Sequence, residues 1–309
     1  MKKISLLIPA YNEEAVLHLM YERLVELIQT NSQYEWEVLF VNDGSQDNSL
    51  SILKDLNSND SRFQYLDLSR NFGKECAMMA GLDNVSGNCV IILDADLQHP
   101  PEIIPQMIAF WEAGYEDIAA KRRSVTGETY FKKSSSKAFY RIMSQLANIP
   151  IQQDTGDFRL LDRVCIDAMK QMRETQRYTK GLYSWIGFRK KTMLFDQSAR
   201  IAGESKWSFT QLTNLALEGI VSFTNAPLRI SAILGFVMSF ASIIYGICIF
   251  VDTMLWGDPV KGYPTLIIMI LFLGGVQLLC IGIFGEYIGR VFNETKQRPP
   301  YIISEKNID

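Results

Sequence analysis

The stretch CVIILDADLQHPPE, residues 89–102, joins an apolar run, a polar cluster and two prolines. Cys89–Leu93 has no polar interruption, which predicts a strand that is buried on both faces. A helix is expected over Pro101–Trp111, because proline fits the first turn of a helix. Asp94 and Asp96 lie between the two, directly after the strand. The stretch therefore predicts a strand-to-helix unit with carboxylates at the carboxyl end of the strand.

The same alternation of strand and helix continues on both sides of this stretch. Four further strands are expected at Ile4–Pro9, Trp36–Val41, Phe63–Leu68 and Ile118–Ala120. Three further helices are expected at Glu13–Thr30, Asp47–Leu56 (with Asp47 or Asn48 as its N-cap) and Lys74–Val85. Apolar strands joined by helices are typical of a parallel sheet covered on both faces. We therefore expect an α/β domain over residues 1–200, with ligands bound at the carboxyl ends of its strands.

Polar side chains follow four of the predicted strands. The clusters are Pro9-Ala10-Tyr11-Asn12-Glu13-Glu14, Asn42-Asp43-Gly44-Ser45, Arg70-Asn71-Phe72-Gly73-Lys74 and Asp94-Ala95-Asp96-Leu97-Gln98-His99. Turn formation alone explains Asn42 and Gly44 taken singly, but four clusters at one sheet edge indicate a binding site. Oxygen ligands without a thiol or imidazole cluster suit Mg²⁺ or Mn²⁺, held by one or two carboxylates together with substrate phosphates.

Composition and charge narrow the function further. The five cysteines are widely spaced and form no CxxC pair, which argues against a disulfide framework and a zinc site. Residues 1–120 hold 7 basic and 19 acidic side chains, residues 121–210 hold 18 and 8, and residues 211–309 hold 6 and 7. The basic middle segment predicts a surface that meets anions. Nucleic acid is the weaker candidate anion, because the remainder of the chain indicates a membrane.

Two uncharged runs near the carboxyl end predict a membrane hairpin. Ile230–Val251 contains 22 residues and Tyr263–Gly285 contains 23, and neither run includes a formal charge. At about 1.5 Å per residue each helix reaches about 33 Å, enough to cross a hydrocarbon core of about 30 Å. The alternative, a buried helix of a large soluble core, rarely needs this length. We assign residues 229–309 to the hairpin and its tail.

Basic residues flank the hairpin on both sides and predict its orientation. They are Arg200, Lys206 and Arg229 before the first run and Arg290, Lys296 and Arg298 after the second. Positive charge favours the cytoplasmic side, so we expect the N-terminal domain and both termini in the cytoplasm. The apolar run at the N-terminus ends at Asn12 and lacks a cleavage site, so no signal peptide is expected.

A juxtamembrane segment, residues 201–228, lies between the domain and the hairpin. Within it, Lys206–Pro227 has apolar residues at three- and four-residue steps, which predicts an amphipathic helix. The helix could lie in the membrane interface, with Trp207 at headgroup depth. Packing against the α/β domain is the equal alternative.

These motifs together resemble a known family. LLIPAYNEE at 6–14, FVNDGSQDNS at 40–49 and LDADLQHPPE at 93–102 resemble the family 2 glycosyltransferases, which have the GT-A nucleotide-sugar fold. GDFRLLDR at 156–163, RIAGESKWS at 200–208 and the terminal hairpin resemble, more narrowly, the polyprenyl-phosphate glycosyltransferases. These include bactoprenol glucosyltransferases and dolichol-phosphate mannose synthases, and the two-helix hairpin favours the bacterial branch.

The resemblance implies a role for each matching residue. The nucleotide-sugar pocket would be lined by Pro9, Tyr11, Asn12, Glu13, Asp43 and Lys74. The metal ion and the diphosphate would be held by Asp94, Asp96 and Gln98, with Asp96 as the first candidate for a direct ligand. Phosphate oxygens of the donor would be bound by Arg200 and Lys206, and the lipid phosphate by Arg122, Lys132 and Arg159. Asp157 would lie beside the acceptor as the candidate base, and the alternative is a loop carboxylate paired with Arg159.

The resemblance also implies a reaction. A single sugar would pass, with inversion, from a nucleoside diphosphate sugar to undecaprenyl or another polyprenyl phosphate at the cytoplasmic face of the bacterial inner membrane. UDP-glucose is the first choice of donor, and UDP-N-acetylglucosamine, UDP-galactose, GDP-mannose and an aminoarabinose donor are alternatives. The Q-x-x-R-W signature of processive synthases is absent. Alternatives of another class are a silent nucleotide-sugar sensor and lipid-sugar translocation by the helices, whose Gly274 and Gly275 are compatible with a homo-oligomer.

Overall fold

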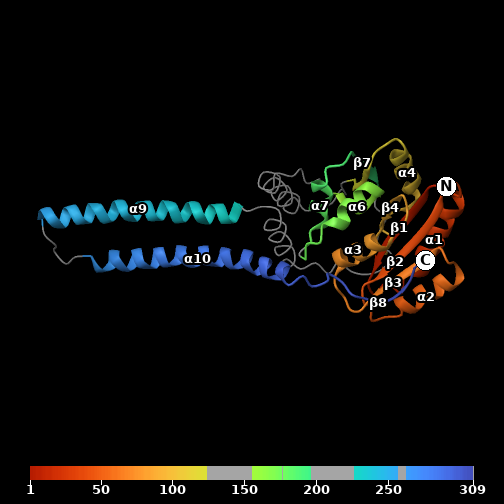
Figure 1. The fold of residues 1–309 in the computed structure, drawn as a ribbon, viewed down its shortest axis with the longest axis horizontal. Helices are drawn as coiled ribbons and strands as arrows, with labels where there is room; N and C mark the ends of the chain where they lie inside the picture. Colours follow the sequence, from red (N-terminus) through yellow and green to blue (C-terminus); the bar gives the residue numbers. More distant parts are fainter. Residues whose placement is uncertain (124–154, 176, 196–225, 257–261, 309) are drawn as a thin grey trace. The chain divides into compact units, whose positions relative to one another are not determined.

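The computed structural model describes residues 1–123, 155–175, 177–195, 226–256 and 262–308. The chain divides into two compact units. One comprises Met1–Ala216 together with Arg298–Asp309, and the other comprises Leu217–Gln297. The first unit is an α/β domain and the second is a pair of long helices (Figure 1).

The domain is built on a single eight-stranded sheet with the order β7-β5-β6-β4-β1-β2-β3-β8. Its strands are β1 (Lys3–Ala10), β2 (Glu35–Asn42), β3 (Phe63–Leu68), β4 (Cys89–Ile92), β5 (Asp117–Arg122), β6 (Thr155–Asp162), β7 (Lys190–Phe195) and β8 (Ile303–Asn307). Strands β1 to β4 are parallel, and so are β5 and β7. Strand β6 runs antiparallel between β4 and β5, and β8 runs antiparallel to β3. The predicted α/β domain with a mostly parallel sheet is confirmed.

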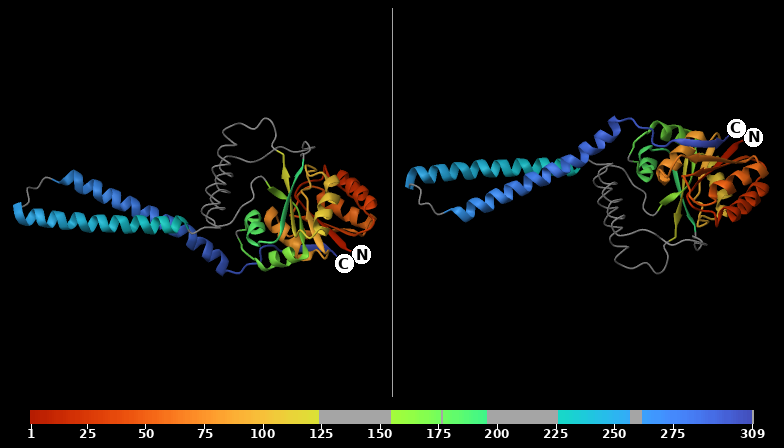
Figure 2. Two further views of the ribbon diagram at one scale, coloured as in Figure 1. Left: turned by 90° about the horizontal axis from the view of Figure 1, so that it is seen from above. Right: turned by 90° about the horizontal axis from the view of Figure 1, so that it is seen from below.

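Helices cover both faces of this sheet. They are α1 (Leu17–Thr30), α2 (Ser49–Asn59), α3 (Lys74–Asn84), the 3₁₀ turn η1 (Pro101–Ile103), α4 (Ile104–Glu112), α6 (Arg163–Gln171) and α7 (Thr179–Trp185). Helices α1 and α2 lie on one side and α3 and α6 on the other, as Figures 1 and 2 show. Asn48 is the N-cap residue of α2, but its side chain makes no capping bond; the backbone N–H of Ser49 donates to Asp47 instead.

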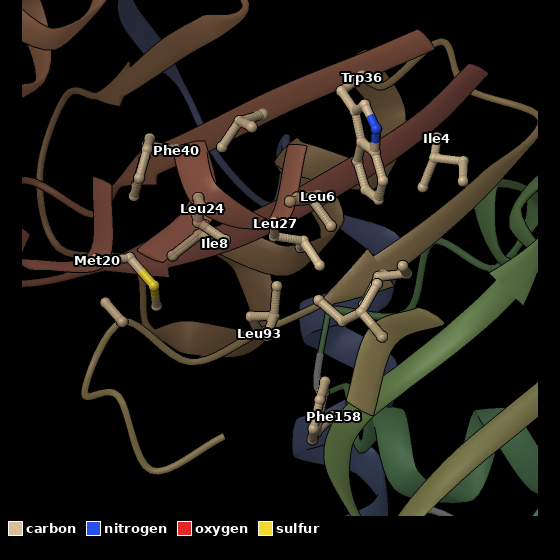
Figure 3. Close-up of a cluster of buried hydrophobic side chains, with 14 of the residues drawn as sticks. Ile4, Leu6, Ile8, Met20, Leu24, Leu27, Trp36, Phe40, Leu93 and Phe158 are labelled. Atoms are coloured by element: carbon tan, nitrogen blue, oxygen red, sulfur yellow. The ribbon is translucent and has the colours of Figure 1, made fainter. Parts of the chain in front are cut away.

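The core between α1 and the sheet follows from the sequence periodicity. Leu24 and Leu27 of α1 point toward Leu6 and Ile8 of β1, and Phe40 of β2 extends the same layer (Figure 3). All five side chains are buried. Each buried aliphatic side chain contributes about 1.5–3 kcal/mol to folding. This layer holds the central parallel strands in place, so their carboxyl ends form one edge.

Strand β8, like β6 and β7, was not predicted from the sequence. It follows the helix pair in the chain, yet it extends the sheet at the outer edge of β3. Glu305 accepts hydrogen bonds from Tyr65 Oη at 2.7 Å and from Lys54 Nζ at 2.6 Å. Tyr301 Oη donates to Asp83 at 2.6 Å just before the strand. The C-terminal tail, which the sequence analysis grouped with the hairpin, is therefore part of the domain.

The second unit contains α9 (Ala226–Trp256) and α10 (Tyr263–Thr295), which lie side by side (Figures 1 and 2). Among the described residues, the candidate membrane spans are Pro227–Cys248 and Phe272–Thr295, and 6% and 0% of their apolar windows are buried. This exposure disagrees with the alternative of buried core helices, which would hide such side chains. Helix α10 also continues beyond the predicted end at Gly285.

Candidate functional site

A cavity of about 290 Å³ lies where the carboxyl ends of the parallel strands meet. It is lined by Pro9, Ala10, Tyr11, Glu13, Asp43, Asn71, Gly73, Lys74, Ala77, Asp94, Ala95 and Asp96. The lining comes from the ends of β1 and β2, the segment between β3 and α3, and the loop after β4. The structure thus brings the four predicted clusters together. A second hollow, of about 590 Å³, lies at the amino ends of β1, β2 and β3 and is lined by none of the predicted site residues.

Hydrogen bonds join the loops after β1 and β2 beside the cavity. The Asn12 backbone N–H donates to Ser45 Oγ at 2.9 Å, and Asn12 Oδ1 accepts from the Gln46 N–H at 2.8 Å. Asn12 adopts a positive φ of 55°, which asparagine tolerates better than most residues. Asn12 therefore shapes the loop, while its neighbour Tyr11 lines the cavity with 42% of its surface exposed.

Asp43 joins the end of β2 to the segment that begins α3. Its two carboxylate oxygens accept the backbone N–H groups of Phe72 at 2.7 Å and Gly73 at 2.9 Å. Burial raises the pKa of Asp43 despite these bonds. Gly44 is required next to it, because φ is +62° and a Cβ would lie 2.4 Å from the backbone of Arg70. Asp43 thus builds the cavity wall and keeps free lone pairs that can face a ligand.

Lys74 links the two acidic parts of the site. Its Nζ lies 2.5 Å from Asp94 Oδ1 and 3.0 Å from Asp157 Oδ2. Burial lowers the pKa of Lys74, but the two carboxylates outweigh burial and the net shift is upward. Burial raises the pKa of Asp157, yet the Lys74 charge more than offsets it and keeps this carboxyl ionised. Sequence reasoning placed Lys74 on the nucleotide wall and missed its contact with Asp157, because β6 was not predicted.

Asp94 and Asp96 are the candidate metal ligands. Both line the cavity, and the Gln98 backbone N–H donates to Asp96 Oδ1 at 3.1 Å. Gln98 itself is not among the residues that line the cavity. Within the described ranges, no three acidic, histidine or cysteine side chains form a metal-binding group. Two carboxylates at an open cavity still fit Mg²⁺ or Mn²⁺, which usually complete their coordination with substrate phosphates and water.

Arg159 has surroundings that differ from the expected lipid-phosphate site. It is 2% exposed, and its Nη1 lies 3.1 Å from both carboxylate oxygens of buried Asp117. Its guanidinium also lies 3.5 Å from the ring centre of Tyr183. These contacts show a structural ion pair under α7. The alternative considered for Asp157, an ion pair with Arg159, is not what the structure shows, because Asp157 contacts Lys74 and Arg159 pairs with Asp117.

Replacing this buried arginine should cost stability. Among the described residues, Arg159→Leu leaves the Asp117 carboxylate with Lys190, 3.9 Å away, as its remaining cationic partner. Breaking a buried ion pair costs about 3–5 kcal/mol. The expected result is a lower thermal midpoint of the detergent-solubilised protein. An unchanged midpoint would show that Asp117 finds another partner, and the surface variant Arg189→Leu is the control.

Other predicted residues fall at the margin of the described structure or outside it. Arg122 ends β5 with an exposed side chain. Three predicted phosphate-binding residues lie outside the described residues: Lys132, Arg200 and Lys206. The expected helix over Lys206–Pro227 also lies outside them, apart from its last two positions, which begin α9.

Glu75 is a site neighbour that sequence reasoning missed. Its carboxylate accepts the backbone N–H of Thr179 at 3.3 Å and the Thr179 hydroxyl, which fixes α7 beside α3. Burial raises the pKa of Glu75 to about 6, with a smaller contribution from the Asp157 charge. Its position next to Lys74 in the first turn of α3 was the available signal.

A mostly parallel α/β domain with this acidic cavity at the strand ends is a GT-A-like glycosyltransferase domain. Residues 5–169 match the model of glycosyl transferase family 2, and residues 226–291 match the GtrB C-terminal hairpin. The chain belongs to glycosyl transferase family 2 and is an enzyme of that class.

Full-length relatives agree with this assignment. An uncharacterized glycosyltransferase of Synechocystis is 44% identical, covering 98% of this chain and 95% of the relative. The bactoprenol glucosyl transferase of Shigella phage SfV is 42% identical, covering 98% and 99%. A similar solved structure is that of glucosyl-3-phosphoglycerate synthase from Mycobacterium tuberculosis, in complex with Mn²⁺, UDP and glucosyl-3-phosphoglycerate. The identity is 15% and the TM-score is 0.45, over 72% of this chain and 78% of the other.

Proposed function

We propose that the protein transfers one sugar, with inversion, from a nucleoside diphosphate sugar to polyprenyl phosphate, and that UDP-glucose is the donor. The observation that carries this proposal is the Asp94–Lys74–Asp157 chain of contacts at the cavity, in a chain that also has an apolar hairpin. Relatives named bactoprenol glucosyl transferase support the acceptor and the sugar. UDP-N-acetylglucosamine, UDP-galactose, GDP-mannose and an aminoarabinose donor remain alternatives for the same site.

The donor half of the site must stabilise the leaving diphosphate. Negative charge grows on this group as the bond to the anomeric carbon breaks. A divalent ion held by Asp94 and Asp96 would supply positive charge at the diphosphate. Lys74 lines the same cavity, so its ammonium can add to that stabilisation. Tyr11 and Asp43 line the same cavity, and we assign them to the nucleoside.

The acceptor half needs little help from a base. The second pKa of a phosphate monoester is about 6, so polyprenyl phosphate is already mostly a dianion at neutral pH. Asp157 is held ionised by Lys74, and its side chain is 11% exposed. We therefore assign Asp157 the positioning of the acceptor or the relay of a late proton, as much as the role of a base. Arg122, Lys132, Arg200 and Lys206 complete the proposed phosphate contacts.

The topology of the sheet supports a cytoplasmic location of both hairpin ends. Strand β8 follows α10 but pairs with β3 of the N-terminal domain. A chain that leaves this domain, enters a membrane and returns to the same sheet must cross the membrane an even number of times. Two apolar helices meet this condition, and the flanking basic residues favour the cytoplasm.

Sugar transfer by purified full-length protein to undecaprenyl phosphate tests the proposal. A panel of radiolabelled UDP- and GDP-sugars would be assayed, with and without EDTA. The expected result is a chloroform-extractable labelled product from UDP-glucose that disappears with EDTA. A product from another donor would correct the sugar. Absence of product with every donor, from protein that still binds nucleotide, would contradict the proposed acceptor reaction.

A further inference from the structure

His99 ends the loop that carries the two candidate metal ligands, although it is not among the residues that line the cavity. His99 is 9% exposed, and its Nδ1 accepts the backbone N–H of Asp94 at 3.2 Å. The imidazole therefore fixes the point at which the chain leaves β4. An acceptor at this position sets the direction in which the Asp94 carboxylate leaves the backbone.

The other contacts of His99 join this loop to β6. Its ring stacks on Phe158, with ring centres 4.7 Å apart and planes at 22°. Phe195 of β7 meets His99 edge-on at 6.0 Å and Phe158 edge-on at 5.6 Å. Phe158 is buried and directly follows Asp157. The stack thus fixes the acidic loop against the strand that presents Asp157.

These contacts close a circuit around the site. His99 accepts a hydrogen bond from the Asp94 backbone, the Asp94 carboxylate contacts Lys74, and Lys74 contacts Asp157. Asp157 is bonded in the chain to Phe158, on which His99 stacks. The His99 ring and the Asp94 carboxylate are two points at which the loop takes part in this circuit. A shift of either one changes the separation between the donor and acceptor halves.

The loop also stores backbone strain that these contacts must hold. Leu97 has a φ of +59°, a conformation that a bulky side chain rarely adopts, yet it is fully buried. Such a conformation costs about 1–3 kcal/mol and persists only when its surroundings fix it. Burial of Leu97 and the stacking of His99 on Phe158 help to hold the loop in this conformation.

We propose that His99 is a positioning residue that sets the Asp94–Asp96 loop for binding of a divalent cation with a nucleoside diphosphate. This inference rests on the proposed function, since that function supplies the ligand. The hydrogen bond to the Asp94 backbone aims the carboxylates, and the stack on Phe158 keeps their distance from Asp157. Residues that orient metal ligands change metal affinity or activity about 10–100-fold when they are replaced.

Two substitutions separate the hydrogen bond from the stack. His99→Phe keeps an aromatic ring against Phe158 and removes the acceptor, whereas His99→Asn keeps an acceptor near the Nδ1 position and removes the ring. The matched control is His18→Phe, because His18 is the only other histidine and is exposed on α1. All three would be made in the full-length chain and purified in detergent.

The principal measurement is binding of UDP by calorimetry as a function of Mn²⁺ concentration, without donor or acceptor. We expect His99→Phe to raise the half-saturating Mn²⁺ concentration about 10-fold or more, with UDP binding in EDTA unchanged. His99→Asn should lie closer to wild type, and His18→Phe should equal it. A lower thermal midpoint with an unchanged Mn²⁺ dependence would overturn the inference and leave His99 with a purely structural role.

The same experiment distinguishes a failure of this inference from a failure of the proposed function. Wild-type protein that binds UDP with Mn²⁺ but transfers no sugar to undecaprenyl phosphate would refute the proposed reaction and leave the role of His99 intact. Normal transfer together with normal Mn²⁺ dependence in His99→Phe would refute only the role of His99. If His99→Phe does not fold, His99→Leu compared with His99→Asn provides the same test of the acceptor.

Discussion

Asp157→Asn is expected to lower the turnover of sugar transfer about a hundredfold or more, while UDP affinity changes about twofold or less. The substitution keeps the size of the side chain and removes its charge. In the protein this carboxylate contacts Lys74 but is not among the residues that line the cavity. Its loss should therefore misplace the acceptor without disturbing the nucleotide.

Turnover at saturating donor and UDP binding by calorimetry check this prediction. Asp167→Asn is the matched control, because Asp167 is exposed on α6 and its ion pair with Arg163 is long, at 3.9 Å. The control should match wild type in both measurements. Equal losses in turnover and UDP affinity for Asp157→Asn would contradict a role on the acceptor side.

Lys74→Met should be more damaging, since it affects both halves of the site. The ammonium separates two carboxylates, at 2.5 Å from Asp94 and 3.0 Å from Asp157. Without it, the carboxylates repel each other and one cation is lost from the cavity. Removing one preorganised charge-stabilising group costs about 10²–10³-fold in rate. We expect a loss of this size in kcat/KM, together with weaker UDP binding.

The pH dependence provides a second measure of the same substitution. Lys74 lowers the pKa of Asp157 by its charge, against the upward effect of burial. In Lys74→Met the pKa of Asp157 rises, so the acidic limb of the pH–rate profile should move to higher pH. Lys2→Met is the control, because Lys2 pairs with Glu112 at the surface. An acidic limb that does not move would show that Asp157 ionisation does not limit the rate.

The parallel half of the domain could be predicted from local sequence. Strands β1, β2, β3 and β4 are apolar runs of a few residues, and each is followed by helical periodicity or turn residues. Parallel strands bring their carboxyl ends to one edge. The meeting of Tyr11, Asp43, Lys74 and Asp94 at one cavity follows from that rule.

The rest of the fold and of the site could not be predicted, because it depends on contacts between residues that are distant in sequence. Strand β6 carries Asp157 and Arg159, which resemble surface residues until Lys74 and Asp117 are brought against them. A buried arginine cannot be recognised without its carboxylate. Strand β8, with the sequence ISEKN, has no apolar run, because it pairs along an exposed sheet edge. The position of His99 against Phe158 likewise required the antiparallel pairing of β4 and β6.

The late position of β8 in the chain has a consequence for biosynthesis. A ribosome makes β3 early and makes residues 303–307 only after both apolar helices. Until then the outer edge of β3 offers unpaired backbone groups, which other chains can recognise. Completion of the sheet must therefore wait until both apolar helices have been synthesised. A nascent chain that stalls before residue 303 would carry an open edge and be prone to aggregation or degradation.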